Sequence, residues 1–298
     1  MRFFAIVAAL ALALRCRADP LTQKLLDRLA EEASAFEQTA PNLISEETLR
    51  QKALKLYKPR FHPRVETPGN QPAGPQWQNR EIHSEYAFAS VGEPPSIREI
   101  RKVLSVDGKT VNTSEHALRD LMRTLQANDD KSRKKLLEDF EKHGLIGTAT
   151  DFGQILLLFA RRDQERYEFS AVGERLLGAD RCIVFAYRQH DGPGALTIYD
   201  PRGRVQPQAA GEIWVERDSF RLMRVTIKSV RGAAAGAVRD EAQVDYLMTS
   251  HGVLAPVSVI HREYRGGSLA AENLFTYAPF RRFGSSADIK FTETAVKP

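Results

Sequence analysis

Few residues of this chain combine the types and the spacing that chemistry needs. His261 and Glu263, in the run H-R-E, would point to the same side of a strand, where both could reach one metal ion. Two ligands do not make a site, and the polar face of a strand explains the pair equally well. The other histidines are scattered without motif spacing: His62, His83, His116, His143, His190 and His251. We therefore predict neither a metal site nor a cofactor.

Nucleophilic catalysis has no motif to support it. Cys182 stands between Arg181 and the run I-V-F-A, a setting more typical of an inert buried cysteine than of a nucleophile. The chain has no G-x-S-x-G elbow, Walker loop, G-x-G-x-x-G, H-E-x-x-H or paired C-x-x-C. A pair of carboxylates working as acid and base stays open, because their separation depends on the fold. We expect a non-enzymatic protein and keep a hydrolase as an unsupported alternative.

The N-terminus predicts export. An unbroken apolar run, Phe3 to Leu14, follows Arg2, and the small residue Ala18 comes shortly after it, as in a secretory signal peptide over residues 1–18. The run is shorter than the ~20 residues needed to span a bilayer. We expect a periplasmic protein. Two alternatives remain: secretion, or an outer-membrane lipoprotein acylated at Cys16, although Arg15 stands where such signals carry a small residue.

The charge balance argues against nucleic acid as a partner. The net charge of the whole chain is +5, but removing Arg2, Arg15 and Arg17 with the leader leaves 40 basic against 38 acidic residues. These charges are interspersed rather than clustered on one face. Cys182 is then the one remaining cysteine, so no intramolecular disulfide can form. We expect a monomer stabilised by packing, since a chain of this length buries roughly three-quarters of its unfolded surface.

The first part of the mature chain shows helical spacing. Apolar residues recur at this spacing between Leu21 and Phe36, and a second helix is predicted from Ser45, with Leu49, Ala53 and Leu56 on one face. We therefore predict an N-terminal helical segment over residues 19–58. A Pro/Gly-rich linker over 59–79 follows, containing T-P-G-N-Q-P-A-G-P.

From Glu81 onward the apolar residues alternate, which predicts strands. One side of the first strand carries Ile82, Tyr86 and Phe88, and one side of the next carries Ile100, Leu104 and Val106 before the turn D-G-K. A helical insertion is predicted over about 113–144, with Gly144 as its C-cap. The runs I-L-L-L-F (155–159) and C-I-V-F-A-Y (182–187) are predicted to be strands covered on both faces. The alternating segments that follow, among them those around Ile213, Val244 and Val259, predict an antiparallel meander.

These elements predict an α+β fold over residues 80–298. A sheet of about nine to eleven strands has to curl, giving a half-barrel wrapped around helices. The candidate residues lining its concave, apolar side are Tyr86, Phe88, Leu104, Leu157, Phe159, Phe185, Val225, Ile227, Tyr246 and Phe275. Ordinary core packing against the helices is the competing interpretation for each of them.

One stretch resembles a known family. The segment from Gly211 to Lys228, G-E-I-W-V-E-R-D-S-F-R-L-M-R-V-T-I-K, resembles the central hairpin of LolA/LolB/RseB-like periplasmic half-barrels. The later segments L-A-P-V-S-V-I-H-R-E-Y and L-F-T-Y-A-P-F-R-R-F are similar to strands that follow in that superfamily. The resemblance implies a curved antiparallel sheet with a hydrophobic cavity under helices, and binding of lipoprotein acyl chains or other lipids.

Two functional hypotheses follow. In the first, the half-barrel holds a lipid or a lipoprotein acyl chain in a hydrophobic cavity, as a carrier or chaperone would. In the second, the protein is an envelope interaction or sensor module that binds a partner protein without a lipid ligand, and the sheet is a scaffold. An open cavity would favour the first hypothesis, and a packed interior the second.

Overall fold

A computed structural model describes residues 19–54, 76–91, 96–127, 135, 138–145, 151–192, 198–200, 203–232 and 236–283. The first half contains α1 (Pro20–Thr39), η1 (Ala40–Asn42), β1 (Leu43–Leu54), β2 (Trp77–Val91), β3 (Ser96–Val106), β4 (Lys109–Thr110), α2 (Ser114–Ala127), η2 (Ile155–Phe159) and η3 (Gln164–Arg166). The second half contains β5 (Tyr167–Leu177), β6 (Asp180–Gln189), β7 (Ile198–Asp200), β8 (Gly203–Val205), β9 (Ala210–Glu216), β10 (Leu222–Arg231), β11 (Val238–Met248), β12 (Leu254–Arg265), β13 (Ser268–Tyr277) and β14 (Arg281–Arg282).

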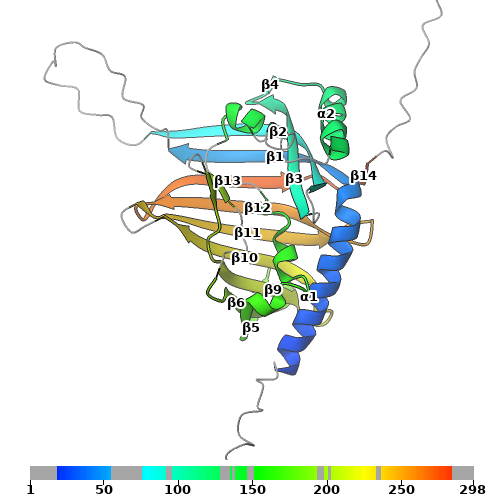
Figure 1. The fold of residues 1–298 in the computed structure, drawn as a ribbon, viewed down its shortest axis with the longest axis vertical. Helices are drawn as coiled ribbons and strands as arrows, with labels where there is room; N and C mark the ends of the chain where they lie inside the picture. The colour runs from blue at the N-terminus through cyan, green and yellow to red at the C-terminus, as the bar shows by residue number, and fades with distance from the viewer. Residues whose placement is uncertain are drawn as a thin grey trace, which may run out of the picture.

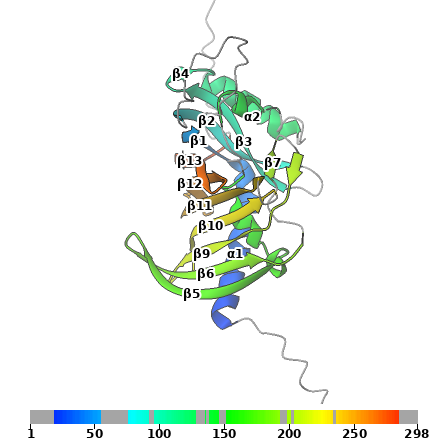
Figure 2. The ribbon, with the colours of Figure 1, turned by 90° about the vertical axis from the view of Figure 1, so that its left-hand side faces the viewer.

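One large open sheet dominates the molecule (Figure 1). Eleven of its twelve strands follow the order β4-β3-β2-β1-β13-β12-β11-β10-β9-β6-β5, and the twelfth, β14, pairs with β1 off this path. Strands β7 and β8 form a separate pair. Strands β9 to β13 are neighbours in chain order and antiparallel, which confirms the predicted meander. The sheet ends at β4 and β5 without closing and is strongly twisted (Figure 2), which confirms the predicted half-barrel.

Different helices pack against the two faces of the sheet. We call the face that packs against α1 and η2 the inner face, and the face under α2 the outer face. Helix α1 buries a stripe at helical spacing, Leu25, Leu29, Ala33 and Phe36, as predicted. These side chains join the main hydrophobic cluster on the inner face. On the outer face a smaller cluster joins Leu121 of α2 to Ile44 and Ile100.

The second N-terminal helix is a wrong prediction, because residues 43–54 form β1. The side chains of Leu43, Glu47, Leu49 and Ala53 are buried on the inner face, with more exposed residues between them. β1 pairs with β2 on one side and with β13 on the other. A spacing of four residues, as between Leu49 and Ala53, keeps side chains together on a helix and also on a strand. The apolar residues alone therefore did not separate the two structures.

The predicted strand over residues 155–159 is also wrong, since this run forms the 3-10 helix η2. Ile155, Leu156 and Phe159 are buried, while Leu157 and Leu158 are partly buried against the main cluster. A short run that is apolar throughout carries no period, so it does not distinguish a strand from a buried helical turn.

Strand β3 contains a bulge that the sequence pattern missed. His83 pairs with Ser105 but Ser84 pairs with Val103, so Leu104 is an extra residue. Ile100 therefore lies in the outer cluster, whereas Val106 packs against the inner one. The prediction that Ile100, Leu104 and Val106 share one side is wrong for this reason.

The turn and the helical insertion agree with prediction. Asp107 and Gly108 have positive φ angles of 49° and 77° between β3 and β4. The helix α2 and the helical residues 138–142 lie within the predicted insertion, and Gly144 follows with a φ of 104°. No helix among the described ranges is both long and apolar enough to cross a membrane.

The predicted signal peptide (1–18), with Cys16, lies outside the described residues. So do residues 55–58 of the predicted helical segment and most of the predicted linker. The last three linker residues, 77–79, belong to β2.

Candidate functional site

The predicted lining residues come together on the inner face of the sheet, with one exception. Those in the main cluster and at most 2% exposed are Tyr86, Phe88, Phe159, Phe185, Val225, Ile227, Tyr246 and Phe275. Leu157 is partly buried against the same cluster, while Leu104 is partly buried at the β3 bulge and belongs to neither cluster. The inner face is thus packed in this conformation.

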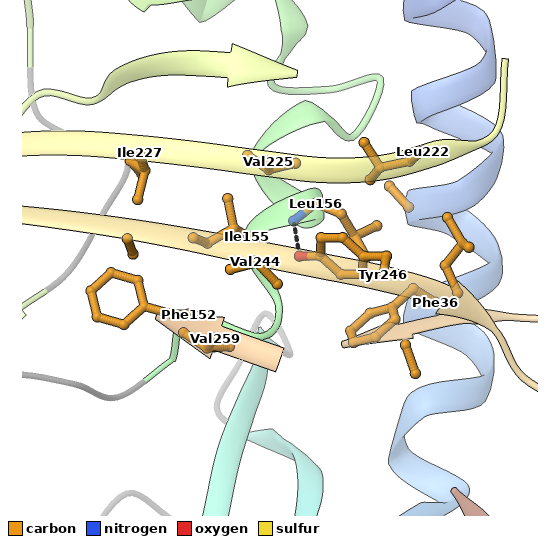
Figure 3. Packing of buried hydrophobic residues seen from close by; sticks show 14 of the residues in the cluster. Phe36, Phe152, Ile155, Leu156, Leu222, Val225, Ile227, Val244, Tyr246 and Val259 are labelled. Carbon is orange, nitrogen blue, oxygen red and sulfur yellow. Dashed lines mark hydrogen bonds between the residues drawn. The ribbon is translucent and has the colours of Figure 1, made fainter. Parts of the chain in front are cut away.

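The covers over the inner face include α1, residues 138–145 with the buried Phe140 and Leu145, and residues 151–159, which we call the plug. Figure 3 shows the plug residues Phe152, Ile155 and Leu156 among Val225, Ile227, Val244 and Val259 of the sheet. Phe36 of α1 contacts Phe88 edge to face, with ring centroids 4.9 Å apart. The plug belongs to no strand, so its position depends on apolar packing and on a few polar contacts.

The first polar contact is the hydroxyl of Tyr246 on β11. It donates a hydrogen bond to the carbonyl of Gly153 (3.0 Å) and accepts one from the amide of Leu156 (3.3 Å; Figure 3). Burial raises the pKa of Tyr246, so the group stays a neutral hydroxyl. Removing this single oxygen would release two backbone groups of the plug.

The second polar contact is the carboxylate of Glu99 on β3. It accepts hydrogen bonds from the amides of Gly153 (2.6 Å) and Asp151 (2.8 Å) and from the hydroxyl of Tyr86 (2.9 Å). The Asp151 carboxylate in turn accepts one from the amide of Glu99 (2.9 Å). A Cβ on Gly153 would lie 2.6 Å from Glu99 Oε1, so only glycine lets the plug approach this closely. The plug is therefore bound to the carboxylate by its backbone.

Glu99 belongs to a buried charged group that we call the clasp, formed by Glu47, Glu99 and Arg101. Arg101 donates from Nη2 to Glu99 (2.6 Å) and from Nε to both oxygens of Glu47 (2.8 and 2.9 Å). Its guanidinium lies 4.9 Å from the ring centre of Tyr86 and 5.4 Å from that of Phe275. Burial raises the pKa of Glu47 despite the opposing effect of Arg101. Sequence reasoning missed all three residues.

A second buried polar group occupies β10 to β12. His261 Nε2 lies 3.1 Å from Asp240 Oδ1, and Arg231 bonds both Asp240 (2.8 Å) and Glu263 (2.9 Å). Phe152 of the plug stacks on the His261 ring at 5.0 Å. His261 thus has a hydrogen-bond partner in Asp240, and Glu263 has an ion-pair partner in Arg231. Within the described ranges no group of three or more His, Cys, Asp or Glu could hold a metal ion.

Cys182 and the surface grooves add no further chemistry. Cys182 is buried on β6, and burial, followed by Asp180 and Glu216, raises the pKa of its thiol. Such a thiol is a poor nucleophile. A groove of about 690 Å³ lies between α1 and residues 160–162, and no predicted lining residue contributes to it.

Fold and site define an open antiparallel half-barrel whose inner face is covered by α1, residues 138–145 and the plug. No family model matches the chain, and no curated protein matches it. It is similar to a LolA superfamily protein from Nitrosomonas europaea, at 10% identity over 87% of this chain and 93% of that chain, with a TM-score of 0.33.

Two further solved structures are similar. One is a domain from Vibrio parahaemolyticus named for outer membrane lipoprotein sorting, at 9% identity over 89% of this chain and 95% of that chain, with a TM-score of 0.37. The other is a DUF1329 family protein from Desulfovibrio piger, at 10% identity over 92% of this chain and 98% of that chain, with a TM-score of 0.36.

Proposed function

We propose that this is an exported, non-enzymatic protein that binds a lipid or a lipoprotein acyl chain on the inner face once the plug moves aside. The proposal of export rests on the apolar run at the N-terminus. The observation that carries the binding proposal is the plug itself: a non-strand segment lies over an apolar surface and is bound to it through Glu99 and Tyr246. An acyl chain would take the place of the apolar plug side chains.

The free energy gained by burying an acyl chain and the free energy lost when the plug leaves the interior are of similar size. About fourteen methylenes at ~0.8 kcal/mol each give roughly 11 kcal/mol of gross burial. The side chains of Ile155, Leu156 and Phe159 give up about 1.5–3 kcal/mol each when they leave the interior. Association removes a further several kcal/mol. These terms nearly cancel, so the wild type binds an acyl chain weakly and the hold on the plug controls the affinity.

The test loosens the plug without changing the shape of the interior. Tyr246→Phe removes one oxygen and two hydrogen bonds to the plug, each worth about 1 kcal/mol. We expect this variant to bind a fluorescent monoacylglycerol about thirtyfold more tightly than the wild type. The matched control is Tyr187→Phe, which also removes a buried tyrosine hydroxyl, but one bonded to the carbonyl of Thr226 on β10. Its affinity should equal that of the wild type.

Native mass spectrometry of protein purified from an exporting host gives a second readout. Co-purified lipid supports the proposal. A lipid-free mass for both proteins, with no uptake of the monoacylglycerol by the wild type or by Tyr246→Phe, would contradict it.

The alternative, a module that binds a partner protein, is favoured by one observation. The inner face has no exposed surface at most of the predicted lining residues, as expected if the sheet is a scaffold with an ordinary core. In that case Tyr246→Phe lowers the free energy of unfolding but creates no lipid binding.

A further inference from the structure

The clasp has a composition that ordinary core packing does not require. Two carboxylates, Glu47 and Glu99, share the single guanidinium of Arg101, and all three side chains are at most 5% exposed. The next charged pair, Arg98 with Asp151, is balanced within itself at 3.9 Å. The clasp therefore sets two buried carboxylates on one guanidinium, and buried carboxylate oxygens are unfavourable unless hydrogen-bond donors satisfy them.

Backbone N–H groups of the plug are two of those hydrogen-bond donors. The amides of Asp151 and Gly153 each bond one oxygen of Glu99, at 2.8 and 2.6 Å. When the plug leaves, the Glu99 carboxylate loses both. The hydroxyl of Tyr86 and the guanidinium of Arg101 still donate to Glu99, so the carboxylate keeps two of its four donors. A ligand that replaces the plug is favoured if its own polar end brings N–H groups to the oxygens that lost theirs.

A further polar group at this place has no partner among the described residues. The Ser84 side chain is 1% exposed, and its hydroxyl makes no hydrogen bond within those ranges. Ser84 lies directly opposite Glu47 in the β1–β2 register, and directly opposite residues present their side chains on the same face. The inner face thus carries a spare hydroxyl beside the clasp, where a polar head group could use it.

We propose that the clasp and Ser84 form the head-group subsite of the acyl-chain site, selective for chains whose polar end donates hydrogen bonds from nitrogen, as an ammonium or an amide does. The inference rests on the proposed function. An alkyl carboxylate or a phosphate head would bring another anion against Glu47 and Glu99 and is excluded by repulsion. The acyl chain then lies along the apolar interior that begins at Phe275, beside Arg101.

The test compares four dodecyl amphiphiles below their micelle concentrations: dodecylammonium, dodecanamide, dodecyltrimethylammonium and dodecanoate. Affinities are measured by calorimetry at pH 7 on the full mature chain. We expect dodecylammonium and dodecanamide to bind at least about tenfold more tightly than dodecanoate, since a hydrogen bond to a charged group is worth about that factor. The trimethyl probe separates charge from donation: it carries the positive charge without an N–H, and we expect it to bind less tightly than dodecylammonium.

Two variants locate the selectivity. Glu99→Gln keeps the shape but removes the negative charge, and it should bring the ammonium-to-carboxylate ratio close to one. Glu85→Gln removes a carboxylate that is equally buried but is paired with Arg281, and should keep the wild-type ratio. The ratio is unaffected by any general loosening of the plug.

Failure of this inference differs from failure of the proposed function. If no probe binds to the wild type or to Tyr246→Phe, the acyl-chain site itself is refuted. If the probes bind without regard to head group, if dodecanoate binds best, or if Glu99→Gln keeps the preference, the head-group subsite is refuted while the acyl-chain site stands.

Discussion

At the scale of single residues, the buried charges on the inner face depend on complete pairing. Arg101 forms ion pairs with two carboxylates, those of Glu47 and Glu99. All three side chains are at most 5% exposed, so water does not take the place of the guanidinium if Arg101 is removed. Removing one member of a buried ion pair is strongly destabilising because the other member stays charged without a partner.

We therefore expect Arg101→Met to lower the free energy of unfolding by about 3–5 kcal/mol. The control is Arg50→Met, which breaks an exposed pair with Glu81 and should leave the free energy of unfolding nearly unchanged. Urea denaturation measures both values. Equal losses for the two variants would show that the clasp is not tightly buried in solution.

A second residue-scale prediction concerns acid stability. Burial opposes ionisation of Asp240, but its bonds to His261 and Arg231 outweigh burial and lower its pKa. A lowered carboxyl pKa stabilises the fold at neutral pH, and this contribution disappears as the pH falls through the folded-state pKa. We expect wild-type stability to fall below about pH 5, and Asp240→Asn to be less stable at pH 7 with a shallower acid decline. The measurement is the free energy of unfolding of both proteins as a function of pH. Parallel curves for the wild type and Asp240→Asn would contradict this prediction.

At the scale of elements, α1 contributes to the core through one stripe. Phe36 is fully buried against Phe88, whereas Gln38, two residues later, is exposed. We expect Phe36→Ala to cost about 3–5 kcal/mol of unfolding free energy and Gln38→Ala close to nothing. Thermal or urea unfolding measures the difference. A small effect of Phe36→Ala would mean that α1 is held only loosely on the inner face.

The elements also show what the sequence can and cannot predict. The alternating segments from β9 to β13 were predicted because each has one buried face and consecutive strands pair. β1 was missed because its apolar spacing fits a helix too, and its partner β13 lies at the other end of the described chain. The 3-10 helix η2 was missed because an all-apolar run has no period.

The clasp was missed for a related reason. Glu99 and Arg101 alternate with Arg98 and Ile100, so β3 has polar residues on both sides and the sequence favoured Ile100 as the inward residue. The bulge at Leu104 then reverses the pattern further along the strand. A pair of charges at i and i+2 on a strand, flanked on the same side by Ile97 and Val103, is the signal that could have identified the inner face.

At the scale of the whole molecule, the protection of backbone amides against hydrogen exchange should vary across the sheet. β1 is paired on both sides, while β5 is an edge strand with Val172 and Leu176 exposed. We expect amide hydrogen exchange to be slowest in β1 and β13 and fastest in β5, because edge amides without a partner meet solvent directly. Exchange in β5 as slow as in β1 would indicate that another chain covers that edge.

The pairing of Leu49 with Phe275 joins the beginning of the sheet to its end. Since a ribosome makes β1 before β13 and most of the other strands lie between them in the chain, this pairing of the sheet has to wait until those strands have been made. Until then the backbone groups on one side of β1 have no strand partner. The newly made chain is thus expected to mature slowly and to depend on chaperones that shield it during the wait.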